Sequence, residues 1–186
     1  MKRRAAFWPL VLSPLAAGAD EVKVQVERHG STVLTQVEVH VPAAQGAVWA
    51  VLTDYEHMAS FLSVLKSSSI QRRSGEQLEV EQVAQTSVGP FKFTPASLRT
   101  VELTPMREIR TRLISGDFLA FDSRTTLQPR EQGTLITTHS EYTPKAWLPP
   151  LLGPSMIESE TRKQYAQLLA EVARRVHQAA TAPQAP

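Results

Sequence analysis

One long stretch near the end of the chain has helical periodicity, and it limits what the other residues can form. Ser155 is a suitable N-cap, and Glu158 three residues later completes a capping box. The prolines before it, the last of which is Pro154, are excluded from a helix interior. No Gly or Pro then interrupts the sequence until Pro183. We therefore predict a helix over 155–177, roughly 35 Å long.

This predicted helix is amphipathic, so it needs a partner surface. Its larger side chains lie three or four residues apart and form one stripe, which consists of Ile157, Thr161, Tyr165, Leu168, Leu169, Val172 and Val176. Charged residues, Glu171 and Arg175 among them, are expected mostly on the other face. The rest of the chain shows the pattern of short strands. The economical arrangement is one long helix laid across one antiparallel sheet.

The first residues have the pattern of a secretory signal peptide. A basic segment at 2–4 precedes a short apolar run over 5–16, and Ala17-Gly18-Ala19 is an A-x-A cleavage motif. We expect a signal peptide over 1–19, cleavage after Ala19, and a periplasmic or secreted protein. A membrane anchor is the alternative, although the run is shorter than the ~20 residues that a membrane span needs.

Removal of this segment changes the charge of the protein. The chain has 20 Lys and Arg against 18 Asp and Glu, and loss of the three basic residues at 2–4 leaves 17 against 18. We therefore expect no net attraction to nucleic acid or to an anionic membrane. The chain has no cysteine, which excludes disulfides. Residues 20–178 are expected to form a single domain, followed by a disordered tail over 179–186.

Alternation of apolar and polar residues predicts strands through most of the chain. A hairpin is expected over 21–41, with its turn at His29-Gly30-Ser31. A helix that opens at Pro42 follows, and then a second short helix that Asp54 caps and that ends near Leu62. The short turns between the later strands favour antiparallel neighbours. These six strands are predicted over 68–73, 78–88, 91–103, 108–114, 118–127 and 134–142.

Two segments of this layout resemble a known superfamily. They are Val41-Pro42-Ala43-Ala44, continued by Val48-Trp49-Ala50-Val51-Leu52-Thr53-Asp54-Tyr55, and the turn Gly116-Asp117-Phe118. Both are similar to the START-type (SRPBCC, helix-grip) superfamily, and in particular to its exported bacterial branch described as coenzyme Q-binding or polyketide cyclase-like. The resemblance covers about 21–177. It implies an α+β fold of START/Bet v1 type, in which a curved antiparallel sheet wraps around the C-terminal helix and an apolar cavity lies between them.

Motifs of catalysis and metal binding are absent from the sequence. There is no G-x-S-x-G elbow and no P-loop. The histidines lack metal-ligand spacing, and they are His29, His40, His57, His139 and His177. His139 and Glu141 share a strand face and could interact, although solvent-facing polar residues are the commoner case. We expect no catalytic residue, no metal and no cofactor.

Strand parity identifies candidate ligand-binding residues. The strand faces expected to meet the helix mix large apolar side chains with small hydroxyls, which is a usual lining of small-molecule cavities. A tightly packed core with outward hydroxyls is the alternative. The candidates, in the cavity or at its entrance, are Arg99, Thr111, Phe121, Thr125, Thr138, Tyr142, Trp147, Leu151, Tyr165 and Leu168.

Arg99 is the sharpest of these candidates. An inward guanidinium needs a partner, because an unpaired buried charge is costly. Asp117, Glu102 or the polar head group of a ligand could provide it. The alternative is a β-bulge that turns Arg99 out to solvent.

The apolar segment 146–153 is the other candidate region. Trp147 and Leu151 could control ligand access or touch a membrane transiently, or they could cap the core beneath the helix. Trp49, Tyr55 and Phe61 are expected in the core.

The function that these features favour is binding of a hydrophobic small molecule, such as a lipid, a quinone or a polyketide-like compound, by a monomeric, non-enzymatic carrier or sensor. The first alternative is a cyclase, aromatase or dehydrase on the same fold, which needs an inward acid or base; Tyr142, Arg99 and Asp117 are the candidates. The second is a structural protein of the cell envelope that interacts through the Trp147 segment, for which a filled interior is expected.

Overall fold

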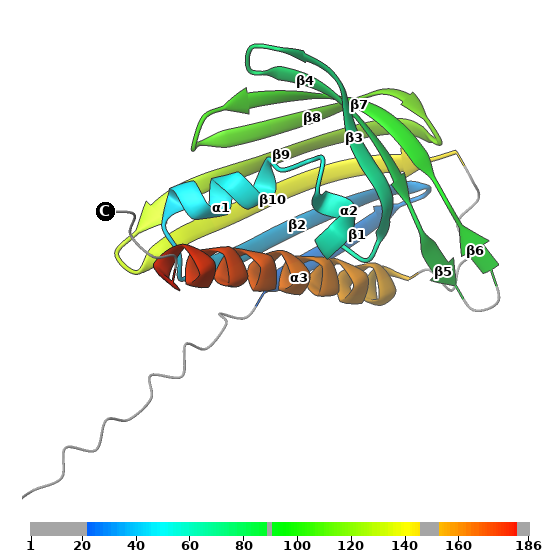
Figure 1. The fold of residues 1–186 in the computed structure, drawn as a ribbon. Coiled ribbons are helices and arrows are strands. Elements are labelled where there is room, and N and C mark those ends of the chain that lie inside the picture. Colours follow the sequence, from blue (N-terminus) through cyan, green and yellow to red (C-terminus); the bar gives the residue numbers. More distant parts are fainter. Residues whose placement is uncertain (1–21, 89–90, 146–152, 182–186) are drawn as a thin grey trace, which may run out of the picture.

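The computed structural model describes residues 22–88, 91–145 and 153–181, and in them three helices lie over one face of an antiparallel sheet (Figure 1). This is the α+β helix-grip arrangement that the sequence predicts. The strands are β1 (Lys23–His29), β2 (Thr32–Val41), β3 (Leu65–Ser74), β4 (Gln77–Ala84), β5 (Thr86–Val88), β6 (Phe91–Phe93), β7 (Ala96–Thr104), β8 (Glu108–Gly116), β9 (Phe118–Arg130) and β10 (Gly133–Pro144). The helices are α1 (Gln45–Leu52), α2 (Met58–Phe61) and α3 (Pro154–Thr181).

The main sheet brings the first hairpin beside the last strand. Its order is β1-β2-β10-β9-β8-β7-β4-β3, and neighbouring strands run antiparallel. Val37 of β2 lies opposite Thr138 of β10, and Val39 lies opposite Ile136. Every other residue of these strands therefore faces the helices.

The chain leaves the main sheet between Ala84 and Ala96. There β5 and β6 pair with each other as a separate ribbon, which projects from one end of the sheet (Figure 1). The Ala84 N–H donates to the Pro95 carbonyl at 2.9 Å and closes the base of the ribbon. The two strands predicted over 78–88 and 91–103 are therefore four shorter ones.

α3 is longer than the sequence predicts. The Gly153 carbonyl accepts hydrogen bonds from the N–H groups of Met156 and Ile157, at 3.1 and 3.4 Å. The predicted N-cap, Ser155, therefore lies inside the helix, and Pro154 takes the first helical position, where its missing N–H has no cost. The helix continues to Thr181, and the residues of the predicted tail beyond it lie outside the described residues.

The predicted stripe of α3 is wrong at two positions. Val176 is exposed, whereas Glu171, expected on the outer face, is buried together with Leu168 and Val172. Glu171 binds Arg175, which also contacts Asp54 in the segment after α1. Its burial depends on two arginines that contact it, as described below.

The two short helices also begin later than predicted. α1 starts at Gln45, not at Pro42, and buries Val48, Val51 and Leu52. His57, and not Asp54, is the N-cap residue of α2. The Asp54 carboxylate instead contacts His57 and accepts a hydrogen bond from Arg175 of α3.

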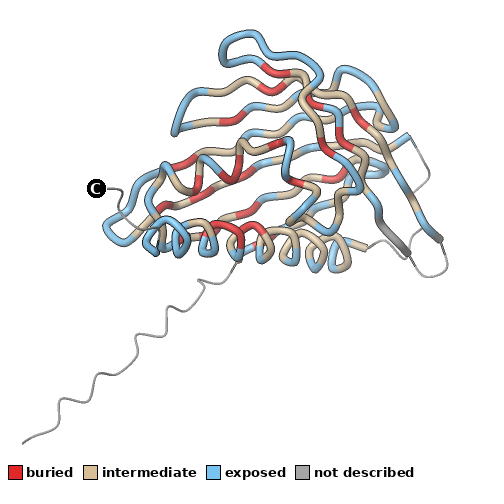
Figure 2. Tube along the Cα trace, viewed as in Figure 1, coloured by how far each residue is buried: buried red, intermediate tan, exposed pale blue. Residues whose placement is uncertain are grey.

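A densely packed region lies at the α1 side of the interior. We call it the closed end, and it consists of Val39, Val41, Val48, Val51, Val101, Leu127, Ile136 and Val172. All of these side chains are at most 3% exposed. Figure 2 shows buried positions where strands pass behind α1 and α3, and further ones on β4 and β7.

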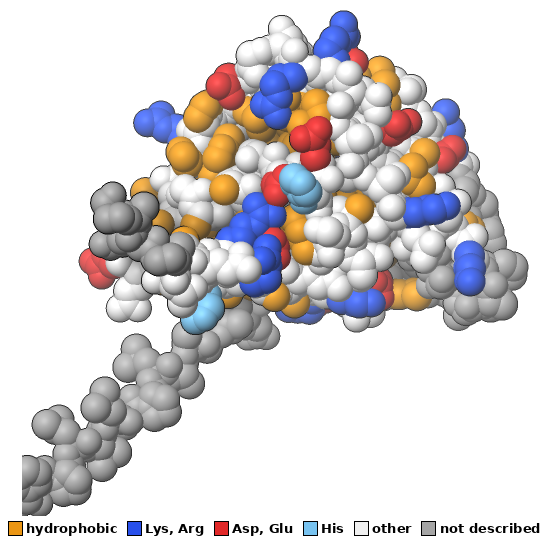
Figure 3. All heavy atoms as spheres, viewed as in Figure 1, with side chains coloured by type: hydrophobic (Ala, Val, Ile, Leu, Met, Phe, Trp, Pro, Cys, Tyr) orange, Lys and Arg blue, Asp and Glu red, His pale blue; other side chains and the backbone are white. Residues whose placement is uncertain are grey.

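The outer surface on the helix side of the molecule has mixed charge. Figure 3 shows basic and acidic side chains interspersed over this face, without a large patch of one sign. None of the described helices has the length and apolar composition that a membrane span requires.

Candidate ligand-binding site

The inward face of β9 and β10 changes character along the two strands. Four successive cross-strand pairs face the helices: Leu127 with Ile136, Thr125 with Thr138, Ser123 with Ser140, and Phe121 with Tyr142. The first pair belongs to the closed end, and hydroxyls and aromatic rings follow it. We call the region beyond the closed end the inner patch, and define it as Arg99, Phe118, Phe121, Ser123, Thr125, Thr138, Ser140, Tyr142 and Tyr165.

The hydroxyl groups of the inner patch bond to one another. The Ser123 and Ser140 Oγ atoms are 2.8 Å apart, and the Thr125 and Thr138 Oγ1 atoms are 2.9 Å apart. The Tyr165 hydroxyl of α3 donates to Thr138 Oγ1 at 2.6 Å. Small hydroxyls occupy little volume and can turn to a new partner, so these residues make the patch polar without adding charge.

Three aromatic rings form the far end of the inner patch. Phe118 meets Phe121 and Tyr142 edge to face, with ring centroids 6.0 and 6.1 Å apart. Phe121 and Tyr142 stack at 6.3 Å. Such geometries are favourable between aromatic rings, and the three rings together form an apolar cluster beside Arg99.

The turn before Phe118 has a glycine for steric reasons. Gly116 has φ 129°, and a Cβ there would lie 2.3 Å from the Ala96 carbonyl oxygen. The Ala96 N–H donates to the Asp117 carboxylate at 2.8 Å, and the Asp117 N–H donates to the Ala96 carbonyl at 2.8 Å. The Lys145 N–H donates to the Asp117 carbonyl at 2.9 Å. This turn therefore holds β7, β9 and β10 together beside the aromatic rings.

Arg99 points inward. Its guanidinium carbon lies 4.3 Å from the centre of the Phe121 ring, and its Nε donates to Ser97 Oγ at 2.8 Å. A register shift between β7 and β8 does fall at Leu98 and Arg99, but it does not turn Arg99 out to solvent. The alternative of an outward arginine is therefore wrong.

The predicted carboxylate partners of Arg99 are engaged elsewhere. Asp117 accepts the Ala96 N–H, and Glu102 pairs with Arg112 at 3.2 Å. Among the described residues no carboxylate contacts Arg99. Burial lowers the pKa of Arg99 to about 10, while the nearby Tyr55 acts to raise it, so the guanidinium still carries its charge at neutral pH.

The phenols of the inner patch are neutral at physiological pH. Burial raises the pKa of Tyr142 to about 12. Burial also raises the pKa of Tyr165 to about 12, although the hydrogen bond to Thr138 acts to lower it. Tyr55, which is buried behind Arg99, has its pKa raised by burial as well. These groups can donate hydrogen bonds but do not act as bases near pH 7.

The inner patch is surrounded by protein yet keeps accessible surface. Arg99, Phe121 and Tyr142 are half-buried, whereas Ile136 on the same face is fully buried. The pKa shifts of Arg99 and Tyr142 come from desolvation by surrounding atoms. These side chains are therefore desolvated and still partly accessible.

The remaining candidates lie in different places. Thr111 is inward on β8, opposite Ser123, and is half-buried next to the inner patch. Leu168 is buried in the hydrophobic core. Trp147 and Leu151 lie outside the described residues. Ser123 and Ser140 were not among the predicted site residues, although they share strand parity with Thr125 and Thr138, and nothing in the sequence pointed to the edge-to-face contacts of Phe118.

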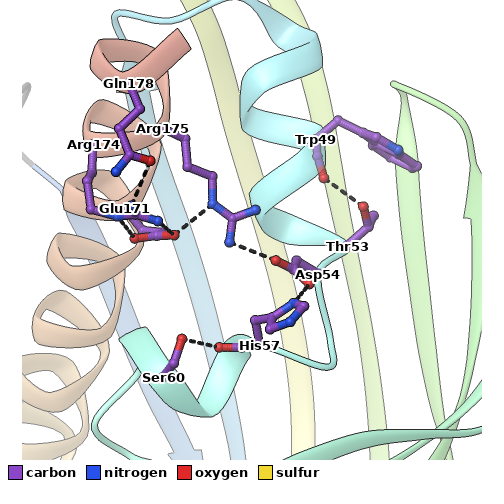
Figure 4. A network of polar contacts seen from close by, with 9 residues as sticks. All are labelled: Trp49, Thr53, Asp54, His57, Ser60, Glu171, Arg174, Arg175 and Gln178. Atoms are coloured by element: carbon purple, nitrogen blue, oxygen red, sulfur yellow. Dashed lines mark hydrogen bonds and ion pairs between the residues drawn. The ribbon is translucent and has the colours of Figure 1, made fainter. Parts of the chain in front are cut away.

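A network of charged side chains joins α3 to the segment between α1 and α2 (Figure 4). Arg175 Nη2 contacts the Asp54 carboxylate at 2.7 Å, and Arg175 Nε contacts Glu171 at 2.7 Å. Arg174 also binds Glu171, at 2.6 Å, and His57 Nδ1 lies 2.6 Å from Asp54. The spacing of Glu171, Arg174 and Arg175 along the helix could have suggested part of this network.

This network explains the buried carboxylate of α3. The Arg174 hydrogen bond, assisted by Arg175 and opposed by burial, lowers the pKa of Glu171 to about 2. Burial acts to raise the pKa of Asp54, but hydrogen bonds from His57 and Arg175 lower it. The network fastens the C-terminal half of α3 over the closed end and lies away from the inner patch.

The outer face of the sheet carries His139 and Glu141. They line a shallow recess of about 450 Å³ together with residues of β1, β2 and β9. The described part of the chain holds no group of three or more His, Asp or Glu arranged to bind a metal ion.

A sheet wrapped around a long terminal helix, with an inward mixture of aromatic rings, hydroxyls and one arginine, defines the class of helix-grip proteins. Residues 32–177 match the family of polyketide cyclase/dehydrase and lipid transport proteins, and the chain belongs to this family. None of the curated proteins is a significant match.

Solved structures of the START superfamily have the same fold. The aromatase/cyclase Zhui from Streptomyces sp. R1128 has a TM-score of 0.62 at 18% identity, over 78% of this chain and 96% of its own. The STAR-related lipid transfer protein from Xanthomonas axonopodis has a TM-score of 0.61 at 13% identity, over 83% and 99%. A START superfamily protein from Mycobacterium smegmatis has a TM-score of 0.57 at 20% identity, over 80% and 99%. At these identities the likeness concerns the fold.

Proposed function

We propose that this protein binds a hydrophobic small molecule against the inner patch, as a carrier or sensor and not as an enzyme. The observation that carries the proposal is the state of Arg99, Phe121 and Tyr142, which face inward, are surrounded by protein and still keep accessible surface. A family that includes lipid transport proteins supports the same reading.

Binding at the inner patch would come mainly from burial of apolar ligand surface. Each square ångström of apolar surface removed from water contributes about 25 cal/mol. The three aromatic rings offer an apolar packing surface, and the hydroxyls beside them can orient a polar group of the ligand. This is the usual division between affinity and orientation in small-molecule sites.

Cyclase or aromatase chemistry is the second candidate function. The family includes polyketide cyclases, and the likeness to an aromatase/cyclase supports it. Arg99 and the hydroxyls could stabilise a developing enolate oxygen. However, the shifted tyrosine and arginine groups of the described site titrate far above neutral pH, so they are poorly suited to general acid–base catalysis. Conversion of a poly-β-ketone by the purified protein would favour the second candidate.

A native purification tests the first candidate. We expect a lipid, a quinone such as coenzyme Q, or a polyketide-like compound to co-purify with the protein and to be identified by mass spectrometry. Ser140→Leu fills the inner patch and should reduce the recovered compound at least about tenfold. His139→Leu places the same side chain on the outer face one residue away and should leave recovery unchanged. Equal recovery with both variants would contradict binding at the inner patch.

We further propose that the chain is exported and acts as a monomer. The basic segment, the apolar run and the Ala17-Gly18-Ala19 motif support export. N-terminal sequencing of the protein from the periplasm or the culture medium should begin at Asp20. Light scattering of the mature protein should give the mass of one chain.

A transient contact with a membrane through Trp147, which lies outside the described residues, is part of the same proposal, and we add a second surface to it. Ile114 and Leu119 flank the turn at Gly116 and are 45% and 67% exposed. Exposed apolar residues of this kind often mark contact surfaces. Leu119→Asp should reduce co-sedimentation with lipid vesicles, and an unchanged vesicle-bound fraction would remove this surface from the proposal.

A further inference from the structure

Arg99 has hydrogen-bonding capacity that the protein does not use. Its Nε donates to Ser97, and one face of the guanidinium covers the Phe121 ring. Within the described residues, the two terminal nitrogens, Nη1 and Nη2, make no hydrogen bond or ion pair. They carry the forked donors with which arginine binds two oxygens at once.

The charge of Arg99 is also uncompensated. The two carboxylates that the sequence suggested as its partners, Glu102 and Asp117, are paired with Arg112 and with the Ala96 N–H. The other titratable groups on the described inner patch are the phenols of Tyr142 and Tyr165. Tyr55 lies behind Arg99 as a neutral phenol. A desolvated cation without a counter-charge is unfavourable, so an anion that enters the patch would gain more here than at an exposed arginine.

We infer that the ligand of the inner patch is an amphipathic carboxylic acid, whose carboxylate pairs with Nη1 and Nη2 of Arg99 and whose apolar body lies on the aromatic rings. The inference rests on the proposed function, because it names the chemistry of the molecule bound there. The Tyr142 hydroxyl, which has no hydrogen-bond partner among the described residues, is the second donor available to the head group.

Other head groups fit these residues less well. A quinone or alcohol is neutral and leaves the charge of Arg99 uncompensated. A phosphate monoester carries close to two negative charges at pH 7, and the described patch offers one cation for it. A carboxylate has one charge and two coplanar oxygens, which match one guanidinium fork.

A pair of fluorescent probes that differ only in the head group tests the inference. 11-(Dansylamino)undecanoic acid carries a carboxylate, and its methyl ester is neutral. Each is titrated at pH 7.5 into the purified protein after removal of bound lipid. A charge-assisted hydrogen bond corresponds to roughly 10- to 100-fold in affinity. We therefore expect the wild-type protein to bind the acid at least about tenfold more tightly than the ester.

Two substitutions with the same change of formal charge identify the arginine responsible. Arg99→Gln should abolish the preference for the acid and leave the affinity for the ester within about twofold of wild type. Arg112→Gln is the matched control, because Arg112 lies on the neighbouring strand with its side chain 54% exposed on the outer face. This variant should keep the full preference. Arg99→Lys keeps the charge but not the fork and should give an intermediate preference.

The outcomes separate this inference from the proposed function. Equal affinity of the wild-type protein for acid and ester, or a preference that survives in Arg99→Gln, would overturn the inference and leave hydrophobic binding intact. Failure of both probes to bind the wild-type protein would count against the proposed function itself. Circular dichroism confirms that each variant is folded. If Arg99→Gln does not fold, the relative affinity of the wild-type protein for acid and ester still tests the inference.

Discussion

The closed end and the inner patch are built on the same strands, and they differ in side-chain volume and polarity. At the closed end Leu127 and Ile136 face α1 and are 3% and 0% exposed. A few residues further along β9 and β10, Ser123 and Ser140 take the equivalent inward positions and are half-buried. The comparison teaches that the backbone of this fold does not itself leave the interior open. Small hydroxyl side chains do so where branched aliphatic ones would close it.

The two regions also divide stability from binding. Burial of branched aliphatic side chains contributes about 1.5–3 kcal/mol for each one, and the closed end consists of such side chains. The inner patch places serines and threonines at positions where larger residues would fit the same face. We interpret this as stability given up for ligand binding.

The largest expected difference between the two regions is in response to truncation. Ile136→Ala leaves a cavity in a packed region and should lower the free energy of unfolding by about 3 kcal/mol. Ser140→Ala, four residues away on the same face, should lower it by less than about 1 kcal/mol. Urea denaturation measures both. Equal losses would show that the inner patch is packed as tightly as the closed end.

The charged network over the closed end should make the free energy of unfolding depend on pH. Glu171→Gln removes the carboxylate that Arg174 and Arg175 share, leaves Arg175 with Asp54 alone, and should lower the free energy of unfolding by about 2 kcal/mol at pH 7. Because the pKa of Glu171 is lowered from 4.5 to about 2 in the folded protein, its contribution is present above pH 4.5 and is lost as the pH falls toward 2.

Denaturation curves measured from pH 7 to pH 2 test this prediction. The wild-type protein should lose more stability between pH 4.5 and 2 than Glu171→Gln does. Glu158→Gln is the control, because Glu158 forms an i,i+4 ion pair with Arg162 on the same helix but is 35% exposed. Its effect should stay below about 0.5 kcal/mol. Identical acid profiles for all three proteins would contradict the assigned pKa.

A larger side chain should reduce stability at the closed end and ligand affinity at the inner patch. Val39→Leu inserts a methylene into the closed end and should cost about 1–3 kcal/mol of unfolding free energy, with no change in ligand affinity. Ser140→Leu should cost about 1 kcal/mol or less and should weaken binding of the dansyl probes. The comparison fails if Ser140→Leu is the more destabilising of the two substitutions.

The smallest expected effect concerns the hydroxyls of the inner patch. Tyr165→Phe removes the hydrogen bond to Thr138 and should lower the free energy of unfolding by about 1 kcal/mol. Tyr142→Phe removes a hydroxyl that has no protein partner in the described structure and should change stability by less than about 0.5 kcal/mol. A larger loss for Tyr142→Phe would indicate a partner that binds Tyr142 in the native protein.

Much of this organisation could be predicted from local patterns. Alternation along the chain placed Thr125, Thr138 and Tyr142 on one face, and the structure confirms that face as inward. The predicted first residue of α3, Ser155, was correct to within one residue. The sequence did not predict that the strands expected over 78–88 and 91–103 are each divided in two, because apolar alternation continues across both breaks.

The orientation of Arg99 and the burial of Glu171 could not be predicted in this way. For Arg99, parity left inward and outward readings open until its contacts with Phe121 and Ser97 were known. For Glu171, helical periodicity predicted the outer face, and a contact with Arg175, itself held by Asp54 of a distant segment, made the buried position favourable.

The sequence by itself determined the period of each strand and helix, the inward face of the sheet and the resemblance to the helix-grip superfamily. These follow from residue spacing and turn chemistry, which act over a few neighbouring residues. Only the tertiary structure decided that β2 pairs with β10, that Arg99 lies over Phe121 and that Glu171 is buried. Each of these depends on contacts between segments far apart in the chain, and desolvation of a charge is set by all the atoms around it and not by its neighbours in sequence.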